Sequence, residues 1–313
     1  KNFNVQDHID RKEARKLDQF SQYAMVSTAE AMADSGIDLE KINLNRAGVI
    51  WGSGIGGLKT FQDESTNFVL GDGTPRYNPF FIPKMIADIV AGHISIKYGF
   101  RGPNYVTVAA CASATNAMID SFNLIRLGKS DIIMSGGSEA AVNESGIGGF
   151  NALRALSTRN DAPTEASRPF DRGRDGFVLS EGAAVLAVEE LEHAKARGAN
   201  ILAEIVGFGI TGDAGHIAAP DAEGTGAKAA MTAALRHANL NTCDVDYINA
   251  HGTSTPLGDV AEVQAVKSLF GDHAYNLAMS STKSCTGHTL GAAGGIESIA
   301  VVKAINESVM PPT

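Results

Sequence analysis

The sequence has no hydrophobic run of the roughly 18 residues that a membrane-spanning helix needs. It shows no secretory signal at its first residues either, so we expect neither a membrane span nor a membrane partner. Cysteine is scarce: Cys111, Cys243 and Cys285 are odd in number and far apart. This spacing fits neither a disulfide framework nor a metal-ligand cluster, and it is typical of a reducing compartment. We therefore predict a cytoplasmic protein with no metal site.

Positive charge is also in short supply, with 26 Lys and Arg against 35 Asp and Glu and a net charge of -9. A protein that binds nucleic acid irrespective of sequence is usually basic, so we expect no nucleic-acid partner. Aromatic residues make up only 6% of the chain, whereas hydrophobic residues make up 44%. A chain of 313 residues with this composition can bury a large core, in one large domain or two moderate ones.

The pattern of apolar residues predicts alternating strands and helices, and therefore an α/β fold with a mainly parallel sheet covered by helices. In the first half, helices are predicted over 12–35, 84–98 and 114–127, and strands over 46–51, 105–110 and 131–137, with two short strands and the start of a helix within 177–198. The rhythm then begins again, with strands over 201–209, 246–250 and 277–281, and helices over 225–238, 259–270 and 291–306. We interpret this as two halves with a boundary near residue 200. Residues 151–176 form a polar segment long enough to indicate a functional or interfacial loop.

Cys111 lies where a predicted buried strand, ending near Thr107 and Val108, gives way to the predicted helix 114–127. The unpaired N–H groups and positive dipole at the start of a helix favour a thiolate and could hold a developing oxyanion. The alternative is a buried packing residue, which is the commoner fate of a free cysteine. Position alone does not decide between the two.

A second loop, DYINAHGTSTPLGDVAE at 246–262, follows a predicted strand and carries His251. Ligands of open α/β sheets bind at the carboxyl ends of strands, so this histidine is well placed for chemistry. The alternative is a histidine that only satisfies loop backbone groups. Asp259 and Glu262 precede an apolar run with capping-box spacing, which favours a structural role for both.

A third loop, SSTKSCTGHTLGAAGGIES at 280–298, carries Lys283 and His288 at another strand end. Glu297 could pair with Lys283, although an exposed charge on a helix face is the alternative. Cys285 has no strand-to-helix junction of its own, so we interpret it as a packing residue. Three strand-end loops with one thiol, two imidazoles and an ammonium favour a Cys/His/His site suited to acyl transfer through a thioester.

The segment VIWGSGIGG offers a competing interpretation, because Gly52, Gly54 and Gly57 match a dinucleotide fingerprint and Asp72 follows at a suitable distance. The context is poor. LKTFQDESTNFVL predicts only a weak helix after the loop, and Asp72 lies between two glycines rather than at a strand end. We therefore do not expect a nucleotide site.

Taken together, the motifs resemble those of the β-ketoacyl-[acyl-carrier-protein] synthases, in particular the elongating type II group of thiolase-like condensing enzymes. The resemblance covers essentially the whole chain and rests on AACASA (109–114), GGFNALRALSTRND (148–161), SRPFD, RDGFVLSEGA, HGTSTPLGD (251–259) and STKSCTGHTLGAAG (281–294).

The resemblance implies the thiolase fold, in which two similar αβαβα halves form a five-layered structure, and a homodimer. Residues 1–199 would be the half with the nucleophilic cysteine, and 200–313 the half with the two histidines. The family normally begins with a strand ahead of Lys1 and continues past Thr313. Its C-terminal segment carries a gating phenylalanine and the second oxyanion-hole N–H, so we expect this sequence to be a truncated piece of such a chain.

For the reaction, the resemblance implies that Cys111 accepts the acyl group. His251 and His288 would bind the malonyl thioester carbonyl and stabilise the enolate left by decarboxylation. Lys283 would orient and polarise the site, with Glu297 as its partner. The product would be a 3-oxoacyl chain longer by two carbons, formed without any metal or redox cofactor because loss of the malonyl carboxylate drives the step.

The resemblance also implies supporting roles outside the reacting groups. Glu262 would support the site, Thr253 and Thr255 would hydrogen-bond the phosphopantetheine arm, and Phe150 would line the entrance for the acyl chain. An acidic acyl carrier protein would dock on the basic residues Lys12, Arg15, Lys16 and Arg154, although for the first three a solvated helix face is the alternative.

Rival interpretations within the same fold are a ketosynthase of polyketide synthesis, a thiolase and a non-catalytic chain-length-factor-like partner. Chain-length factors carry another residue in place of the nucleophile, so the presence of Cys111 argues against that class. Thiolases generally use a second cysteine as base, and the two histidine loops argue against them. Acyl chain-length preference cannot be inferred from the sequence.

Overall fold

The computed structural model describes residues 3–313, which pack as two units. The first unit contains the described residues up to Gly149, together with Leu179–Ile201 and Thr289–Ile299; the second contains Phe150–Val178, Leu202–His288 and Ala300–Thr313. Among residues 3–313, no helix is both long enough and apolar enough to cross a membrane.

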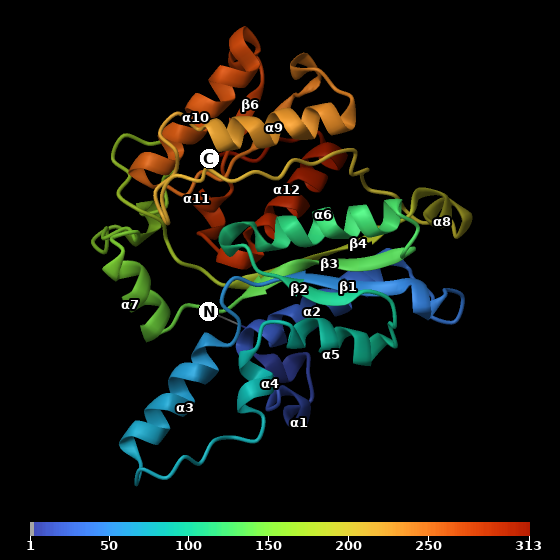
Figure 1. Cartoon of the computed structure of the whole chain (residues 1–313), viewed down its shortest axis with the longest axis vertical. Coiled ribbons are helices and arrows are strands. Elements are labelled where there is room, and N and C mark those ends of the chain that lie inside the picture. Colours follow the sequence, from blue (N-terminus) through green and yellow to red (C-terminus); the bar gives the residue numbers. More distant parts are fainter. Residues whose placement is uncertain (1–2) are drawn as a thin grey trace. The chain divides into compact units, whose positions relative to one another are not determined.

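The first unit is built on a four-stranded sheet in the order β2-β1-β3-β4 (Figure 1). Its strands are β1 (Ala47–Gly52), β2 (Asn104–Thr107), β3 (Ile132–Glu139) and β4 (Gly182–Glu189). β1 pairs parallel with β2 and β3, whereas β4 pairs antiparallel with β3. Every residue of β1 and β3 is buried, as expected for central strands covered on both faces. The predicted mainly parallel sheet is thus present.

Helices cover both faces of this sheet (Figure 1). Those of the first unit are α1 (Arg11–Ala14), α2 (Gln19–Ser35), α3 (Leu58–Leu70), α4 (Phe81–Met85), α5 (Ile89–Tyr98), α6 (Ser113–Arg126) and α8 (Leu191–Ala196), with short 3-10 turns η1 (Val5–Asp7), η2 (Leu44–Arg46), η3 (Ala110–Ala112) and η7 (Leu290–Ala292). Trp51 packs with residues of α2 and α5 such as Phe20 and Ile94. Its neighbour Ile50 packs with Ala117 of α6, because successive strand residues point to opposite faces.

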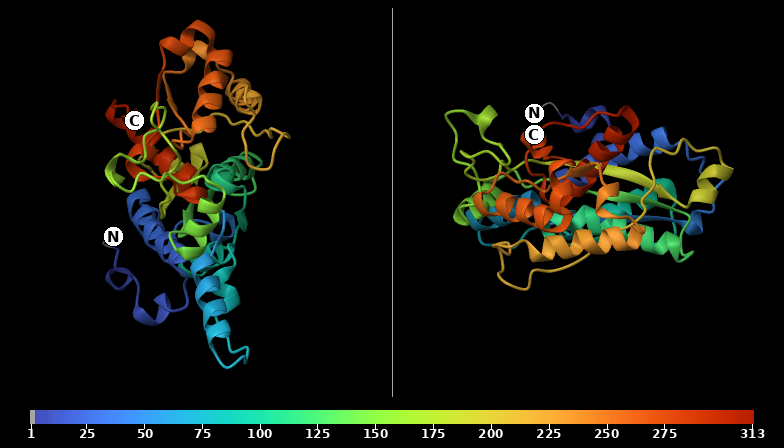
Figure 2. Two further views of the ribbon diagram at one scale, coloured as in Figure 1. Left: turned by 90° about the vertical axis from the view of Figure 1, so that its left-hand side faces the viewer. Right: turned by 90° about the horizontal axis from the view of Figure 1, so that it is seen from above.

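α3 extends away from the sheet, and residues 71–80 form the tip beyond it (Figures 1 and 2). Apolar side chains of α3 stay exposed there, with Val69 at 75% and Leu70 at 80%.

The second unit has a two-stranded parallel sheet of β5 (Tyr247–Asn249) and β6 (Ala278–Ser280). Its helices and turns are η4 (Pro163–Glu165), α9 (Thr225–Ala238), η5 (Thr242–Asp244), α10 (Pro256–Phe270), η6 (Gly271–Tyr275) and α11 (Lys283–Thr286). Val266 and Phe270 of α10 bury against Leu277. Two further helices, α7 (Glu144–Ala152) and α12 (Ala293–Glu307), contain residues of both units.

Several predicted elements differ from the structure. The helix predicted over 12–35 breaks into α1 and α2, because the Asp18 carboxylate accepts the Phe20 N–H and caps a new helix. The helix predicted over 84–98 likewise divides into α4 and α5. The two short strands predicted within 177–198 are one strand, β4. Residues 201–209 form no strand, since no strand of the described residues pairs with them.

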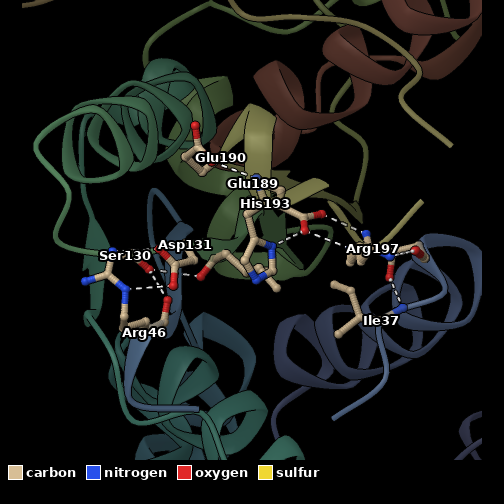
Figure 3. Close-up of polar contacts among 10 residues, drawn as sticks. Ile37, Arg46, Ser130, Asp131, Glu189, Glu190, His193 and Arg197 are labelled. Atoms are coloured by element: carbon tan, nitrogen blue, oxygen red, sulfur yellow. Dashed lines mark hydrogen bonds and ion pairs between the residues drawn. The ribbon is translucent and has the colours of Figure 1, made fainter. Parts of the chain in front are cut away.

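A network of ion pairs closes the end of the first unit's sheet at which β1 and β3 begin (Figure 3). Arg46 donates two hydrogen bonds to the Asp131 carboxylate, at 2.6 and 2.7 Å. On β4, Glu189 accepts two hydrogen bonds from Arg197, both at 2.7 Å, and contacts His193. The Cys111 turn follows the opposite end of the sheet, where β1, β2 and β3 finish.

Candidate active site

Cys111 lies in the 3-10 turn η3, between the end of β2 and the start of α6, as the sequence predicted. The turn is held by hydroxyl groups: Ser113 Oγ donates to the Ala110 carbonyl at 2.7 Å, and Thr107 Oγ1 donates to the Ser113 carbonyl at 2.7 Å. Ala110 has φ of 47°, a left-handed conformation that is uncommon for a residue with a Cβ. The backbone is therefore forced into a sharp elbow that presents Cys111 at a helix N-terminus.

The strand leading to this elbow is not buried, and that part of the prediction is wrong. β2 is an edge strand, and Val108, just past it, is 65% exposed. Only one side of β2 pairs with a strand, β1, within the described residues.

The glycine-rich segment after β1 packs against the Cys111 elbow. A Cβ on Gly52 would lie 2.3 Å from the Ala114 backbone nitrogen, so only glycine allows β1 and α6 to approach this closely. The N–H groups of Gly54, Ile55 and Gly56 all donate to the carboxylate of Glu139 at the end of β3. These are the groups that a phosphate would need, which explains the fingerprint without a nucleotide.

The helix after this segment is stronger than the sequence suggested. Residues 58–70 form α3, a helix of 13 residues, where only a weak helix was predicted. Asp72 lies in the exposed turn beyond it, where its carboxylate accepts the Thr74 N–H. As expected, Asp72 does not lie at the end of a strand.

In the second unit, the structure brings together both predicted histidines and the lysine. His251 follows β5, Lys283 begins α11 just after β6, and His288 follows α11. Lys283 Nζ donates to the His251 carbonyl at 2.7 Å and lies 3.5 Å from His251 Nδ1. The two imidazole rings are 5.3 Å apart, centre to centre, and nearly perpendicular. Lys283 and His288 are each only 2% exposed.

This surrounding keeps both imidazoles neutral. Burial and the charge of Lys283 lower the pKa of His288 to about 3. His251 is exposed as a residue, although its ring lies beside Lys283 and His288. Burial, together with Lys283 and His288, holds the His251 pKa well below its usual value. A neutral imidazole carries one N–H donor and one acceptor nitrogen, so two N–H donors are available here at neutral pH.

Glu262 supports the His251 loop directly. Its carboxylate accepts the His251 N–H at 2.7 Å and the Gly252 N–H at 2.8 Å. Burial raises the Glu262 pKa, while these two hydrogen bonds oppose the rise. The predicted capping box is wrong: α10 begins at Pro256, and Glu262 lies well inside the helix and reaches back across the loop.

Asp259 has a structural role, as predicted, but with other partners than a capping box would give. Its carboxylate accepts the Phe170 N–H at 2.8 Å and lies 3.3 Å from Arg174 Nε. Burial raises its pKa. Through these contacts Asp259 ties the long segment 151–176 to the start of α10.

That long segment also contacts the histidine loops. Gly176 N–H donates to the Ser254 carbonyl at 3.0 Å, and His288 N–H donates to the Val178 carbonyl at 2.8 Å. Phe177 contacts His288 edge to face at 5.1 Å, with Phe150 packed 5.4 Å from Phe177. Phe177 and Val178, which directly follow the segment, therefore line one side of the histidine cluster.

The other predicted residues are dispersed. The Thr253 and Thr255 hydroxyls lie 3.0 Å apart in the loop after His251. Glu297 lies on α12. Cys285 is exposed on α11, so its interpretation as a packing residue is wrong.

The four residues predicted to dock a carrier protein lie at the surface. Lys12 is on α1, and Arg15 and Lys16 follow it. Lys16 Nζ pairs with the exposed Glu13 at 2.7 Å. Arg154 is exposed beyond α7 with φ of 54°. A common docking surface for these residues stays a prediction.

Sequence reasoning missed two residues that contact the candidate site. Phe177 packs against His288, and Glu139 binds the backbone beside the Cys111 turn. Glu139 had a recognisable signal, because it is the one charged residue of the buried strand IIMSGGSE. A carboxylate at the end of such a strand needs several hydrogen-bond donors.

The fold, the cysteine elbow and the neutral histidine pair define the class as acyl-transferring enzymes of the thiolase fold. Two family models match the sequence: the N-terminal domain of β-ketoacyl synthases over residues 2–194 and the C-terminal domain over 202–313. The chain belongs to the β-ketoacyl synthase family.

Curated relatives agree with this assignment. The chain is 51% identical to 3-oxoacyl-[acyl-carrier-protein] synthase 2 of Staphylococcus aureus over all 313 residues, which is 77% of that protein. It is 48% identical over its whole length to the protein of that name from Synechocystis, of which it covers 75%.

Solved structures agree as well. A β-ketoacyl synthase from Burkholderia phymatum superimposes with a TM-score of 0.90 at 38% identity, over 98% of this chain and 74% of that one. The ishigamide ketosynthase/chain length factor superimposes with a TM-score of 0.91 at 29% identity, over 100% of this chain and 75% of that one. The predicted family, thiolase fold and condensing-acyltransferase class are confirmed. The division at residues 1–199 and 200–313 and the roles of the site residues stay predictions.

Proposed function

We propose that this protein is a 3-oxoacyl-[acyl-carrier-protein] synthase that joins an acyl group held on Cys111 to a malonyl group. The observation that carries the assignment is a cysteine elbow at a helix N-terminus in the same chain as a pair of neighbouring histidines with lowered pKa values. Its curated relatives at 51% and 48% identity carry that name.

In the first step, the Cys111 sulfur attacks the thioester carbonyl of an acyl carrier protein. A bond forms from Cys111 to the acyl carbon, the bond from that carbon to the carrier sulfur breaks, and the carrier leaves as a thiol with the cysteine proton. The Cys111 N–H, at the start of α6, stabilises the negative charge that develops on the carbonyl oxygen.

In the second step, malonyl carrier protein places its thioester oxygen against the N–H donors of His251 and His288. Loss of carbon dioxide leaves an enolate, which these two donors stabilise. The enolate carbon attacks the acyl carbon on Cys111, a carbon–carbon bond forms, and the bond to the Cys111 sulfur breaks, so that Cys111 leaves as a thiolate carrying the negative charge. The lowered pKa values keep both rings neutral, and each neutral ring has one N–H that can donate to this oxygen.

Lys283 and Glu262 hold this pair in place. The Lys283 ammonium is bonded to the His251 carbonyl, and the Glu262 carboxylate binds the N–H groups of His251 and Gly252. Glu297 is proposed as the partner of Lys283. Departure of the malonyl carboxylate supplies the driving force, so the proposed reaction requires no metal or redox cofactor.

The proposed partner is an acidic acyl carrier protein, which would dock on Lys12, Arg15, Lys16 and Arg154 and pass its pantetheine arm to Thr253 and Thr255. In support, a type II polyketide ketosynthase in complex with its acyl-carrier protein superimposes on this chain with a TM-score of 0.86 at 32% identity, over 94% of this chain and 73% of that one.

We also propose a homodimer in the cytoplasm. An exposed edge strand is a natural pairing site for a second copy, and both Tyr105 on β2 and Val108 after it are exposed. The cytoplasm is proposed because three widely spaced cysteines suit a reducing compartment.

The test is acyl-enzyme formation by the full-length protein with an acyl carrier protein, followed by intact-mass and peptide measurement. Cys111→Ala is expected to abolish the acyl adduct, whereas Cys285→Ala leaves it largely intact. Acyl mass on the Cys285 peptide would contradict the assignment of the nucleophile. No adduct on the wild-type protein would favour the rival, a non-catalytic partner subunit of the chain-length-factor type.

A further inference from the structure

Glu139 is a buried carboxylate beside the Cys111 elbow that the reaction described above does not use. Its side chain is 0% exposed at the end of β3. It accepts hydrogen bonds from the N–H groups of Gly54 at 2.7 Å, Gly291 at 3.0 Å, Ile55 at 3.1 Å and Gly56 at 3.2 Å, and from Ser53 Oγ at 3.1 Å. One carboxylate thus joins the loop after β1 to the turn η7.

Such a group is costly to bury and is retained only when it is well bonded. Burial raises the pKa of Glu139, while the hydrogen bonds from Gly54, Ile55, Gly291 and Ser53 oppose that rise. Since each of its donors is fixed in the main chain or on a short side chain, the carboxylate holds its partners in one arrangement.

The turn η7 repeats the geometry of the turn that holds Cys111. Ala110 has φ of 47° and Leu290 has φ of 48°, and each begins a 3-10 turn of 3 residues that continues into a long helix, α6 or α12. Gly291 therefore occupies in η7 the position that Cys111 occupies in η3. In η7 the Gly291 N–H binds Glu139. In η3 the Cys111 N–H is proposed to bind the substrate oxygen.

The two turns meet at Gly54. A Cβ placed on Gly54 would lie 2.9 Å from Glu139 Oε2, 3.5 Å from the Ala110 carbonyl oxygen and 3.7 Å from the Gly291 nitrogen. Gly137, two residues before Glu139, has equally little space: its Cβ would lie 2.7 Å from the Gly291 carbonyl oxygen and 2.8 Å from Ala114 Cβ. Gly54, which Glu139 binds, thus lies beside Ala110 just before Cys111, and Gly137 on the strand of Glu139 lies beside Ala114 just after it.

We propose that Glu139 is a positioning residue for acyl transfer, which acts by fixing Gly54 and Gly291 against Ala110 and so aiming the Cys111 N–H at the substrate oxygen. The inference rests on the proposed function. It assigns Glu139 no contact with substrate.

The test compares Glu139→Gln with Glu189→Gln in the full-length protein. Glutamine keeps the volume of Glu139 but places an NH2 group where N–H donors converge, so part of the cradle must open. Glu189 is the matched control because it is also a largely buried carboxylate of the β3–β4 ladder. In the β3–β4 ladder, Glu189 lies opposite Ile132 and Glu139 lies opposite Gly182. The two carboxylates are therefore at opposite ends of the ladder, roughly 20 Å apart.

Two rates and the melting temperature are measured for each variant: acylation of Cys111 by acyl carrier protein, and alkylation of Cys111 by iodoacetamide. Alkylation needs an accessible thiolate but no oxyanion site. For Glu139→Gln we expect acylation to fall about 10- to 100-fold while alkylation changes less than about 3-fold. For Glu189→Gln we expect both rates to stay near wild type, even if its melting temperature falls as much as that of Glu139→Gln.

The inference is overturned if Glu139→Gln acylates within about twofold of wild type, or if both variants lose acylation equally, since either result leaves Glu139 only a structural role. An equal fall in acylation and alkylation also overturns it, because the thiol itself would then be affected. In all these cases wild-type acylation stays intact. If the wild-type protein itself forms no adduct on Cys111, the proposed function fails instead.

Discussion

Mild acid is expected to destabilise the folded protein through His288. Its folded-state pKa is about 3, whereas histidine in an unfolded chain titrates near 6.5. Below pH 6.5 the unfolded state therefore binds the additional proton, and stability falls as the pH falls from about 6.5 toward 3. Between pH 7.5 and pH 5, the linkage relation gives a loss of about 2 kcal/mol from this one residue.

The assay is urea unfolding at both pH values for the wild-type protein and for His288→Asn, which has no group that titrates in this range. Unfolding can be followed by circular dichroism and by the fluorescence of Trp51, the single and fully buried tryptophan. The wild type should lose about 2 kcal/mol more than the variant between pH 7.5 and pH 5. As a control, the two proteins should respond in parallel between pH 7.5 and pH 9.

The reasoning is refuted if wild type and His288→Asn lose the same free energy of unfolding between pH 7.5 and pH 5. That result would mean that His288 titrates alike in the folded and unfolded states. The imidazole would then be protonated in the folded protein at pH 5, and burial beside Lys283 would not keep it neutral.

Two further predictions concern the docking surface and the glycine packing. Reversing the charge of Lys12 and Arg15 to Glu should raise the KM for carrier protein several-fold with little change in kcat, whereas Lys303→Glu on α12 should leave both unchanged; an unchanged KM would remove the α1 region from the docking surface. Gly291→Ala should cost about 3 kcal/mol or more of stability, because its Cβ would lie 2.3 Å from the Gly54 nitrogen. Gly148→Ala, where a Cβ meets nothing within 4 Å, should cost nothing, and equal melting temperatures for the two would contradict this account.

The features that sequence reasoning found are those encoded locally. The helix predicted over 225–238 is α9 with the same bounds, because its apolar spacing is a local signal. His251 and Lys283 were found for the same reason: each lies within a few residues of a strand end. Parallel strands of one sheet bring such ends together, as β5 and β6 do.

The features that were mispredicted depend on partners distant in the chain. Glu262 was interpreted by its spacing from Asp259, whereas its hydrogen bonds reach back to His251 and Gly252. Residues 201–209 have the composition of a strand, but a strand is stable only beside another strand, and the described residues supply none. A pattern of residue types indicates which secondary structure the backbone favours. Whether that structure forms depends on the partners that the folded chain supplies.

The glycine segment after β1 shows how a correct physical expectation can lead to a wrong ligand. Gly52, Gly54 and Gly57 indicate a loop whose N–H groups converge, and converging N–H groups do bind an anion. The anion here is the Glu139 carboxylate, 85 residues from Gly54, and it also binds Gly291, 152 residues further on. A nucleotide phosphate could bind this loop only by displacing a buried side chain that already satisfies it. The same carboxylate holds the turn that mirrors the Cys111 elbow, so a motif first interpreted as a nucleotide site becomes part of the support for acyl transfer.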